Sequence, residues 1–339
     1  MSLQKILTKN NTVGINDYNK GMILLSEQSA MTLKSTFKKK SLLFRIWESR
    51  YIYLFLVPGV IFFAIFKYIP IYGVQLAFKK YDVQAGITGS PWVGMYNFEF
   101  LFIDVDFIQA VKNTLILAFM QIGFFYPFPI IIAMLLNEIR FTKYKRVVQT
   151  IYTLPHFLSW VIVSGMIMNL FGSGGAITNL LRVITGTEVT FLTNKDVFRQ
   201  LLVGELLWKE AGWSCILYLA SITAIDPSLY EAATIDGANR WHRMRYITWP
   251  GISMIVIVTF ILRVGSLMNA GFEQIINIYN PTVYSVADII DTYIYRITFQ
   301  RPANFGVSTA VGLFKGLTNC ILLVITNQLC VRIGGEGIV

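Results

Sequence analysis

Six long apolar runs, separated by short polar segments, constrain the fold of this 339-residue chain more than any other feature. Each run can cross a hydrocarbon core about 30 Å thick, because a helix rises about 1.5 Å per residue. Only helices or closed barrels satisfy their backbone polar groups in lipid, and runs of this length favour helices. The sequence therefore predicts an all-α membrane protein with six transmembrane helices, at 51–78, 109–137, 147–171, 200–224, 251–279 and 304–330.

Composition excludes several other classes. Hydrophobic residues make up 55% of the chain and charged residues only 14%, whereas soluble domains carry about 25% charged residues. The net charge of +10 is spread among apolar runs, so it does not indicate nucleic-acid binding. Three cysteines without paired spacing indicate neither a disulfide framework nor a zinc site. Of the two histidines, His156 and His242, we interpret His156 as a helix-packing residue, since a metal site needs several converging ligands.

The distribution of Lys and Arg predicts the orientation. The N-terminal region, the 138–146 loop and the 226–250 loop together carry more basic residues than the intervening loops, which places them in the cytoplasm. Both termini of this multi-pass membrane protein are then expected on the cytoplasmic side. We expect a flexible extension at 1–36, an interfacial amphipathic helix at 37–50, a membrane domain at 51–330 and a cytoplasmic tail at 331–339. The external segments 79–108, 172–199 and 280–303 are long enough to form a cap.

A polar loop of about 25 residues, 226–250, separates two long apolar runs, and the sequence predicts that it forms two short helices. Asp226 can cap the first helix, and Pro227 suits its first position. Two alanines at the centre of one helix face would let another protein approach closely. The residues alone leave two interpretations open, a plain connecting loop or a contact surface.

Polar side chains inside the apolar runs are candidates for a solute path, because ionisable groups at membrane depth usually face a cavity or a partner. We expect Glu205 and Lys209 to pair along one helix face, either as a structural ion pair or as a lining for a hydroxylated solute on which tryptophan could stack. In the sixth run, Ser308, Gly312 and Gly316 indicate close helix packing. The path candidates are Glu205, Trp208, Lys209, Glu210, Trp213, Arg263, Asn269, Glu273, Lys315 and Asn319.

The 226–250 loop also resembles the EAA loop of the permease subunits of bacterial ABC importers, with Trp249 where that pattern has Leu. The matching residues are Glu231, Ala232, Ala233, Asp236, Gly237, Ile247 and Pro250. Other segments, including QTIYTLPHFLSW at 149–160 and VYSVADIIDTYIYR at 283–296, are similar to permeases of maltose-type carbohydrate importers. Within that family the chain looks like the branch that handles complex oligosaccharides and polysaccharide fragments, alginate import permeases included.

This resemblance implies a location in the bacterial cytoplasmic membrane, and it implies that the 226–250 loop forms a cytoplasmic coupling helix. It also implies several partners: a second homologous permease, two cytosolic ABC ATPases, an extracellular solute-binding protein and membrane lipid. The chain contains no G-x-x-x-x-G-K-[ST] phosphate loop, so ATP and Mg²⁺ are expected to bind in the partner ATPase. We therefore expect this chain to be a transport subunit that is not itself an enzyme. An ion-coupled secondary transporter or channel is the alternative. An integral membrane enzyme is disfavoured by the lack of a catalytic constellation, and the identity of the saccharide stays open.

Overall fold

The computed structural model describes residues 47–187, 190–300 and 302–332, and these are helical apart from turns and one isolated bridge between Lys79 and Trp92. Most of the expected 1–36 extension, the 37–50 helix and the 331–339 tail lies outside the described residues. The chain divides into two units, Met1–Tyr72 and Gly73–Val339. The first contains α3 (Arg50–Phe63) and the π-helical turn η1 (Ala64–Tyr68), and the 3-10 segment η2 (Ile69–Phe78) runs into the second.

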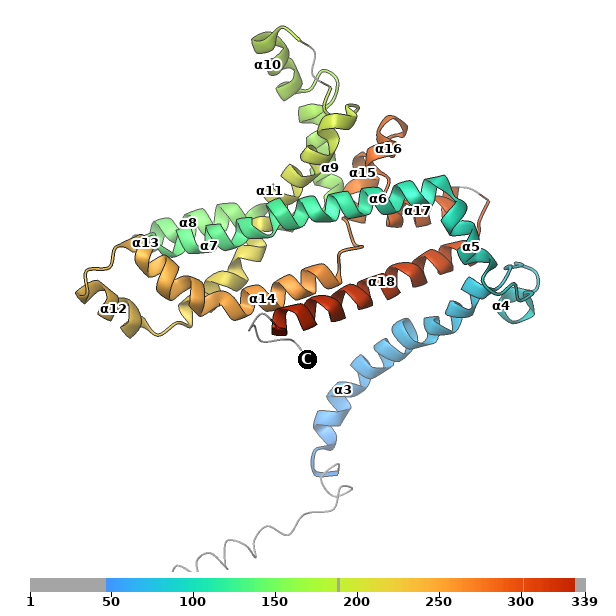
Figure 1. Ribbon diagram of the computed structural model, residues 1–339, viewed down its shortest axis with the longest axis horizontal. Helices are drawn as coiled ribbons and strands as arrows, with labels where there is room; N and C mark the ends of the chain where they lie inside the picture. Colours follow the sequence, from blue (N-terminus) through green and yellow to red (C-terminus); the bar gives the residue numbers. More distant parts are fainter. Residues whose placement is uncertain (1–46, 188–189, 301, 333–339) are drawn as a thin grey trace, which may run out of the picture. The chain divides into compact units, whose positions relative to one another are not determined.

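The second unit is built from helices that alternate long rods with short connecting turns (Figure 1). In chain order they are α4 (Gly86–Gly89), α5 (Tyr96–Ile103), α6 (Val105–Met120), η3 (Gln121–Phe125), α7 (Pro127–Asn137), α8 (Thr142–Thr153), η4 (Leu154–Phe157), α9 (Trp160–Phe171), α10 (Ala176–Thr185), α11 (Lys195–Thr223), α12 (Pro227–Ile235), α13 (Arg240–Arg243), η5 (Met244–Thr248), α14 (Trp249–Gly265), α15 (Phe272–Ile278), η6 (Pro281–Val283), α16 (Tyr284–Ala287), α17 (Ile290–Tyr295), η7 (Arg296–Gln300) and α18 (Phe305–Arg332).

Among the described residues, five helical segments are long and apolar enough to cross a membrane: Arg50–Phe78, Val105–Asn137, Trp160–Thr185, Arg240–Gly265 and Phe305–Arg332. The expected fourth span, 200–224, corresponds to α11 and its C-cap Ala224; α11 is 29 residues long but is not among these five. Charged side chains near its middle lower its hydropathy. The described residues are therefore all-helical and include five candidate membrane spans, whereas the count of six spans stays a prediction.

Two of the expected apolar runs are interrupted. In the third run, 147–171, α8 ends at Thr153 and α9 begins at Trp160, because Pro155 in the intervening 3-10 turn cannot donate a helical hydrogen bond. In the fifth run, 251–279, α14 ends at Gly265 and α15 begins after Gly271, whose φ of 96° favours glycine. The expectation of continuous helices at these two places was wrong.

Four π-helical turns each lie two residues before a proline. They are Ala64–Tyr68, Gln121–Phe125, Met244–Thr248 and Arg296–Gln300, followed by Pro70, Pro127, Pro250 and Pro302. A π-turn widens the ladder to i→i+5 bonds, as in the bond from Tyr126 N to Gln121 O at 2.9 Å. This local widening makes room for the proline ring, which would otherwise clash with the preceding turn. The chain consequently continues as α-helix past Pro127 in α7 and past Pro250 in α14, whereas Pro302 is not helical and the next helix begins at Phe305.

Close helix contacts depend on glycines other than those expected. A Cβ on Gly212 of α11 would lie 2.0 Å from the carbonyl oxygen of Tyr152 in α8, and a Cβ on Gly265 of α14 would meet Leu323 of α18. By contrast, a Cβ on Gly312 or Gly316 would meet no atom of the described residues within 4 Å. The predicted close packing through these two glycines is therefore not seen within the described chain.

Candidate functional site

The polar residues of α11 meet a loop residue that sequence reasoning set aside. Lys209 Nζ donates to Glu210 Oε1 at 2.8 Å and to the His156 carbonyl at 2.9 Å. The other carboxylate oxygen of Glu210 lies 2.7 Å from His156 Nδ1. His156 is positioned by the 3-10 turn at Pro155, so the break between α8 and α9 brings its ring to α11. Lys209, Glu210 and His156 form one cluster, which we call the α11 polar site.

An aromatic ring completes the α11 polar site. The imidazole of His156 stacks on Trp213 at 4.4 Å between centroids and 6° between planes. Phe157 also contacts Trp213 edge to face at 6.0 Å, and Trp213 is still 47% exposed. The cation of Lys209 lies 5.0 Å from the Trp160 ring. Stacked rings beside a charged hydrogen-bonding group form a surface that suits a polar ring such as a sugar.

The expected pair of Glu205 with Lys209 is absent from the structure. Helical spacing allows this pair, but Lys209 binds its chain neighbour Glu210 instead. Glu205 accepts from Gln274 Nε2 at 2.8 Å and is only 4% exposed. Trp208 lies beside Glu205 on the wall of a separate groove between α9 and α11. These two candidates are therefore not part of the α11 polar site.

The remaining path candidates are distributed over α14, the turn after it, α15 and α18. Arg263 Nη2 donates to Gln121 Oε1, and its guanidinium lies 5.5 Å from the Phe125 ring. Lys315 is paired with Asp291 of α17. Asn319 accepts from the Met268 backbone amide at 3.0 Å and so holds the turn after α14. Asn269 and Glu273 are both exposed.

The 226–250 loop begins with a helix, as predicted. Asp226 caps α12 by accepting from the Ser228 amide at 2.9 Å, and this hydrogen bond lowers the pKa of Asp226. The Tyr230 hydroxyl lies 2.9 Å from Thr248 Oγ1, which ties α12 to η5. Gly237 follows with a φ of 76°. The second predicted short helix differs, because α13 runs through η5 into α14 without a break.

The α12 helix is exposed or partly exposed along its whole length. None of its residues is buried, and the apolar Leu229 and Ile235 are 52% and 87% exposed. Of the motif residues, Glu231, Ala232 and Asp236 are exposed, Ala233 and Ile247 are partly buried, and Pro250 is exposed at the second position of α14. A cavity of about 420 Å³ lies between this helix and η5, lined by Ala233, Asp236, Gly237 and Ile247 among others.

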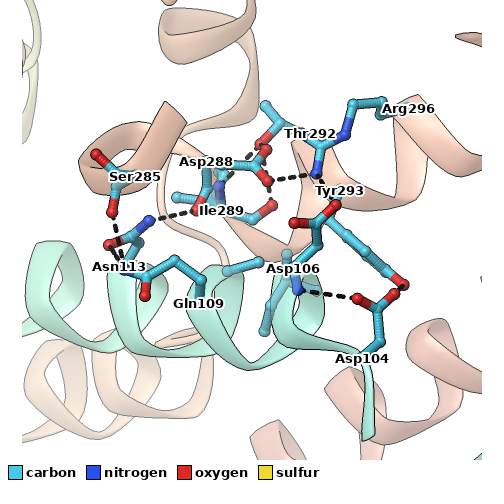
Figure 2. Close-up of polar contacts among 12 residues, drawn as sticks. Asp104, Asp106, Gln109, Asn113, Ser285, Asp288, Ile289, Thr292, Tyr293 and Arg296 are labelled. Carbon is cyan, nitrogen blue, oxygen red and sulfur yellow. Dashed lines mark hydrogen bonds and ion pairs between the residues drawn. The ribbon is translucent and has the colours of Figure 1, made fainter. Parts of the chain in front are cut away.

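A second polar cluster joins α6 to α16, α17 and η7 (Figure 2). Arg296 is 7% exposed, and its Nη2 lies 2.7 Å from Asp288 Oδ2 and 3.8 Å from Asp106 Oδ2. Burial alone would lower the pKa of Arg296, but its hydrogen bond to Asp288 and the charges of Asp288 and Asp106 raise that pKa overall. The Tyr293 hydroxyl donates to Asp104 at 2.6 Å. We call this group the Arg296 clamp.

The Arg296 clamp extends to α11. Asn113 Nδ2 donates to the Asp288 carbonyl at 2.9 Å, and Asn113 Oδ1 accepts from Arg199 Nη2 at 2.8 Å. Gln109 donates to the Ser285 carbonyl at 2.8 Å (Figure 2). Sequence reasoning missed the clamp, although the segment that holds Asp288 and Arg296 was one of those that resembled the carbohydrate permeases. The signal in the sequence was two aspartates and an arginine within this mostly apolar segment, beside a predicted membrane boundary.

Comparison with known proteins identifies the family. Residues 125–329 match the family described as "Binding-protein-dependent transport system inner membrane component". The chain belongs to this family. The permease is 43% identical over 302 residues to the polygalacturonan/rhamnogalacturonan transport system permease protein YteP of Bacillus subtilis (strain 168), covering 89% of this chain and 94% of YteP. It is also 43% identical to protein LplB of the same organism, over 86% of this chain and 92% of LplB.

A solved structure has the same fold. The permease is similar to a chain of the bacterial alginate ABC transporter in complex with alginate pentasaccharide-bound periplasmic protein, with a TM-score of 0.80 and 39% identity over 88% of this chain and 100% of that chain. The expected resemblance to carbohydrate ABC permeases is thus confirmed. The protein is an integral membrane subunit of an ABC importer, and its 125–329 region contains both the α11 polar site and the α12 loop.

Proposed function

We propose that this permease imports acidic oligosaccharides or polysaccharide fragments across the cytoplasmic membrane. A second homologous permease, two cytosolic ATPases that bind ATP and Mg²⁺, and an external solute-binding protein would complete the transporter. The names of the relatives support the substrate class, since polygalacturonan and alginate both carry carboxylate groups. The binding-protein-bound alginate complex supports the solute-binding partner.

The positive charge of Arg263 is the observation that best supports an acidic substrate. Arg263 lies near the end of a helix that can span the membrane, and among the described residues no carboxylate lies within ion-pair distance of it. Its side chain contacts the neutral Gln121 side chain and the Phe125 ring. The other two basic path candidates, Lys209 and Lys315, are each paired with a carboxylate. An unneutralised cation on a membrane-spanning helix is costly unless an anion reaches it, and a uronate carboxylate would do so.

The α11 polar site supplies the complementary neutral contacts. The exposed part of the Trp213 ring can contact a sugar ring, while Glu210 and His156 can exchange hydrogen bonds with its hydroxyls. Glu210 is already held by Lys209, so its position does not depend on the solute. Such a preorganised lining suits a passing solute, because no side chain has to be ordered at each step.

The test of this proposal is uptake of matched acidic and neutral sugars by the complete transporter in proteoliposomes. We expect oligogalacturonides to be taken up and malto-oligosaccharides of equal length to be excluded. Arg263→Gln should lower uptake of the acidic sugar by roughly tenfold, the effect of losing about 1.4 kcal/mol of charge interaction. Arg182→Gln, which removes an exposed cation of α10, is the control. Equal uptake of both sugars would reject the acidic substrate.

We further propose that α12 is the coupling helix that docks in a cleft of the ATPase, on the cytoplasmic side together with both termini. Its exposed Leu229 and Ile235 are apolar side chains on a polar loop, which favours burial by a protein partner. The alanine face would make the closest contact, and Glu231 would meet a basic group of the ATPase. Positive φ at Gly237 explains why the loop needs glycine there.

Two substitutions test the coupling. Gly237→Leu strains the backbone by about 1 kcal/mol or more, and Glu231→Lys reverses a charge that would be worth roughly 1 to 3 kcal/mol if buried at the interface. Both variants should reach the membrane but lose association with the ATPase and solute-stimulated ATP hydrolysis. Full stimulation of ATP hydrolysis and full transport in both variants would indicate that 226–250 is only a connecting loop.

A further inference from the structure

An apolar groove of about 420 Å³ lies between α9 and α11, apart from the α11 polar site. Its walls are formed by Val163, Met166, Ile167, Leu170 and Phe171 of α9, Ile177 of α10, and Gln200, Leu201, Gly204, Glu205 and Trp208 of α11. A Cβ on Gly204 would meet no atom within 4 Å, so this helix presents bare backbone to the groove. Glycines of this kind let a second helix approach closely within a membrane.

The groove contains one carboxyl group with an unused oxygen. Glu205 is 4% exposed; its Oε2 accepts from Gln274 Nε2, while its Oε1 has no hydrogen-bond partner among the described residues. Gln274 cannot serve both oxygens, because its Nε2 also donates to the Leu202 carbonyl at 2.7 Å. A buried polar atom without a partner costs about 1 to 3 kcal/mol, so this oxygen calls for a donor from outside the described chain.

The chemistry of the groove selects its occupant. A lipid chain would fill the apolar walls but has no donor for Glu205 Oε1, and water alone would leave the apolar walls uncovered. A transmembrane helix supplies both, since it packs against Gly204 and can carry a hydroxyl, amide or basic side chain. We propose that the groove docks a helix of the second permease subunit, which presents a hydrogen-bond donor to Glu205. This docking rests on the two-permease assembly proposed above.

Photocrosslinking from two methionines of α9 tests the docking directly. Met166 lines the groove and Met168 does not, although their exposed fractions are similar, at 41% and 44%. With p-benzoylphenylalanine at either position in the complete transporter, we expect the residue at 166 to crosslink to the second permease several times more strongly than the residue at 168. Equal crosslinking from both positions, or crosslinks from 166 to lipid alone, would overturn the proposal.

A pair of glycine substitutions provides the second measurement. Gly204→Leu fills the groove, whereas Gly165→Leu adds the same bulk to α9 outside the residues that line it, where a Cβ likewise meets nothing within 4 Å. Gly204→Leu should lower co-purification of the second permease by roughly tenfold, and Gly165→Leu should leave it unchanged. Equal co-purification by both variants would reject the groove while leaving the assembly intact. A wild-type preparation without a second permease would reject the assembly and the docking together.

Discussion

Replacing Asp288 with Asn is expected to destabilise the permease by about 3 kcal/mol, because the buried Arg296 guanidinium loses its nearest counterion. Two of its nitrogens, Nε and Nη1, already lack hydrogen-bond partners among the described residues. Breaking one side of a buried pair typically costs about 3 to 5 kcal/mol. Asp106 stays 3.8 Å from Arg296 Nη2 and its side chain is 47% exposed, so it partly neutralises the guanidinium charge. The expected loss of stability is therefore at the lower end of that range.

The loss should appear in the thermal unfolding of the detergent-solubilised permease, followed by tryptophan fluorescence. At about 2 °C per kcal/mol for a chain of this size, Asp288→Asn should lower the Tm by roughly 6 °C. The double variant Asp288→Asn/Arg296→Met removes both charges and should recover much of this loss, since no unpaired charge is then buried. A shift below about 1 °C for the single variant, or a double variant no more stable than the single one, would refute the argument from the buried charge.

Three other predictions concern transport, packing and topology. Lys209→Ala or Trp213→Ala should lower uptake by roughly tenfold while the protein still assembles, as measured by uptake and by membrane yield; unchanged uptake in both would remove the α11 polar site from the path. Gly212→Ala should lower the Tm by several degrees because its Cβ would overlap the Tyr152 carbonyl, whereas Gly204→Ala should not; equal Tm values would contradict the close contact of α8 with α11. A cysteine at Thr187 should react with an impermeant maleimide in intact cells, and a need for permeabilisation would invert the predicted orientation.

Local features of the fold were predictable from the sequence because they depend on neighbouring residues. Asp226 and Pro227 start α12 through contacts within one turn, and the positive φ at Gly237 is one that glycine adopts readily. The break at Pro155 was not predicted, because a 3-10 turn here separates two helices inside one continuous apolar run. The length of a run of apolar residues does not reveal such a break.

The partners of charged residues were not predictable, because they come from distant segments. Helical spacing suggested that Glu205 pairs with Lys209, yet Glu205 binds Gln274, which is 69 residues away in the sequence. His156 lies 54 residues from Glu210 and joins it only through the turn after α8. The i,i+4 rule gives the pairs that a helix permits, and tertiary packing decides which of them form.

The arrangement of α12 and α14 offers a mechanical route from the proposed ATPase contact to the proposed path. The hydroxyl of Tyr230 on α12 is hydrogen-bonded to Thr248, and η5 runs without interruption into the 17-residue α14. A helix of that length extends about 25 Å, and Arg263 lies near its far end, two residues before the helix stops at Gly265. Because a continuous helix resists compression, a displacement imposed on α12 would reach the Arg263 guanidinium as a movement of the whole rod. The non-helical turn at 266–271 would absorb that movement before α15. Movement of the coupling helix would therefore act directly on Arg263, the residue proposed to contact the acidic sugar.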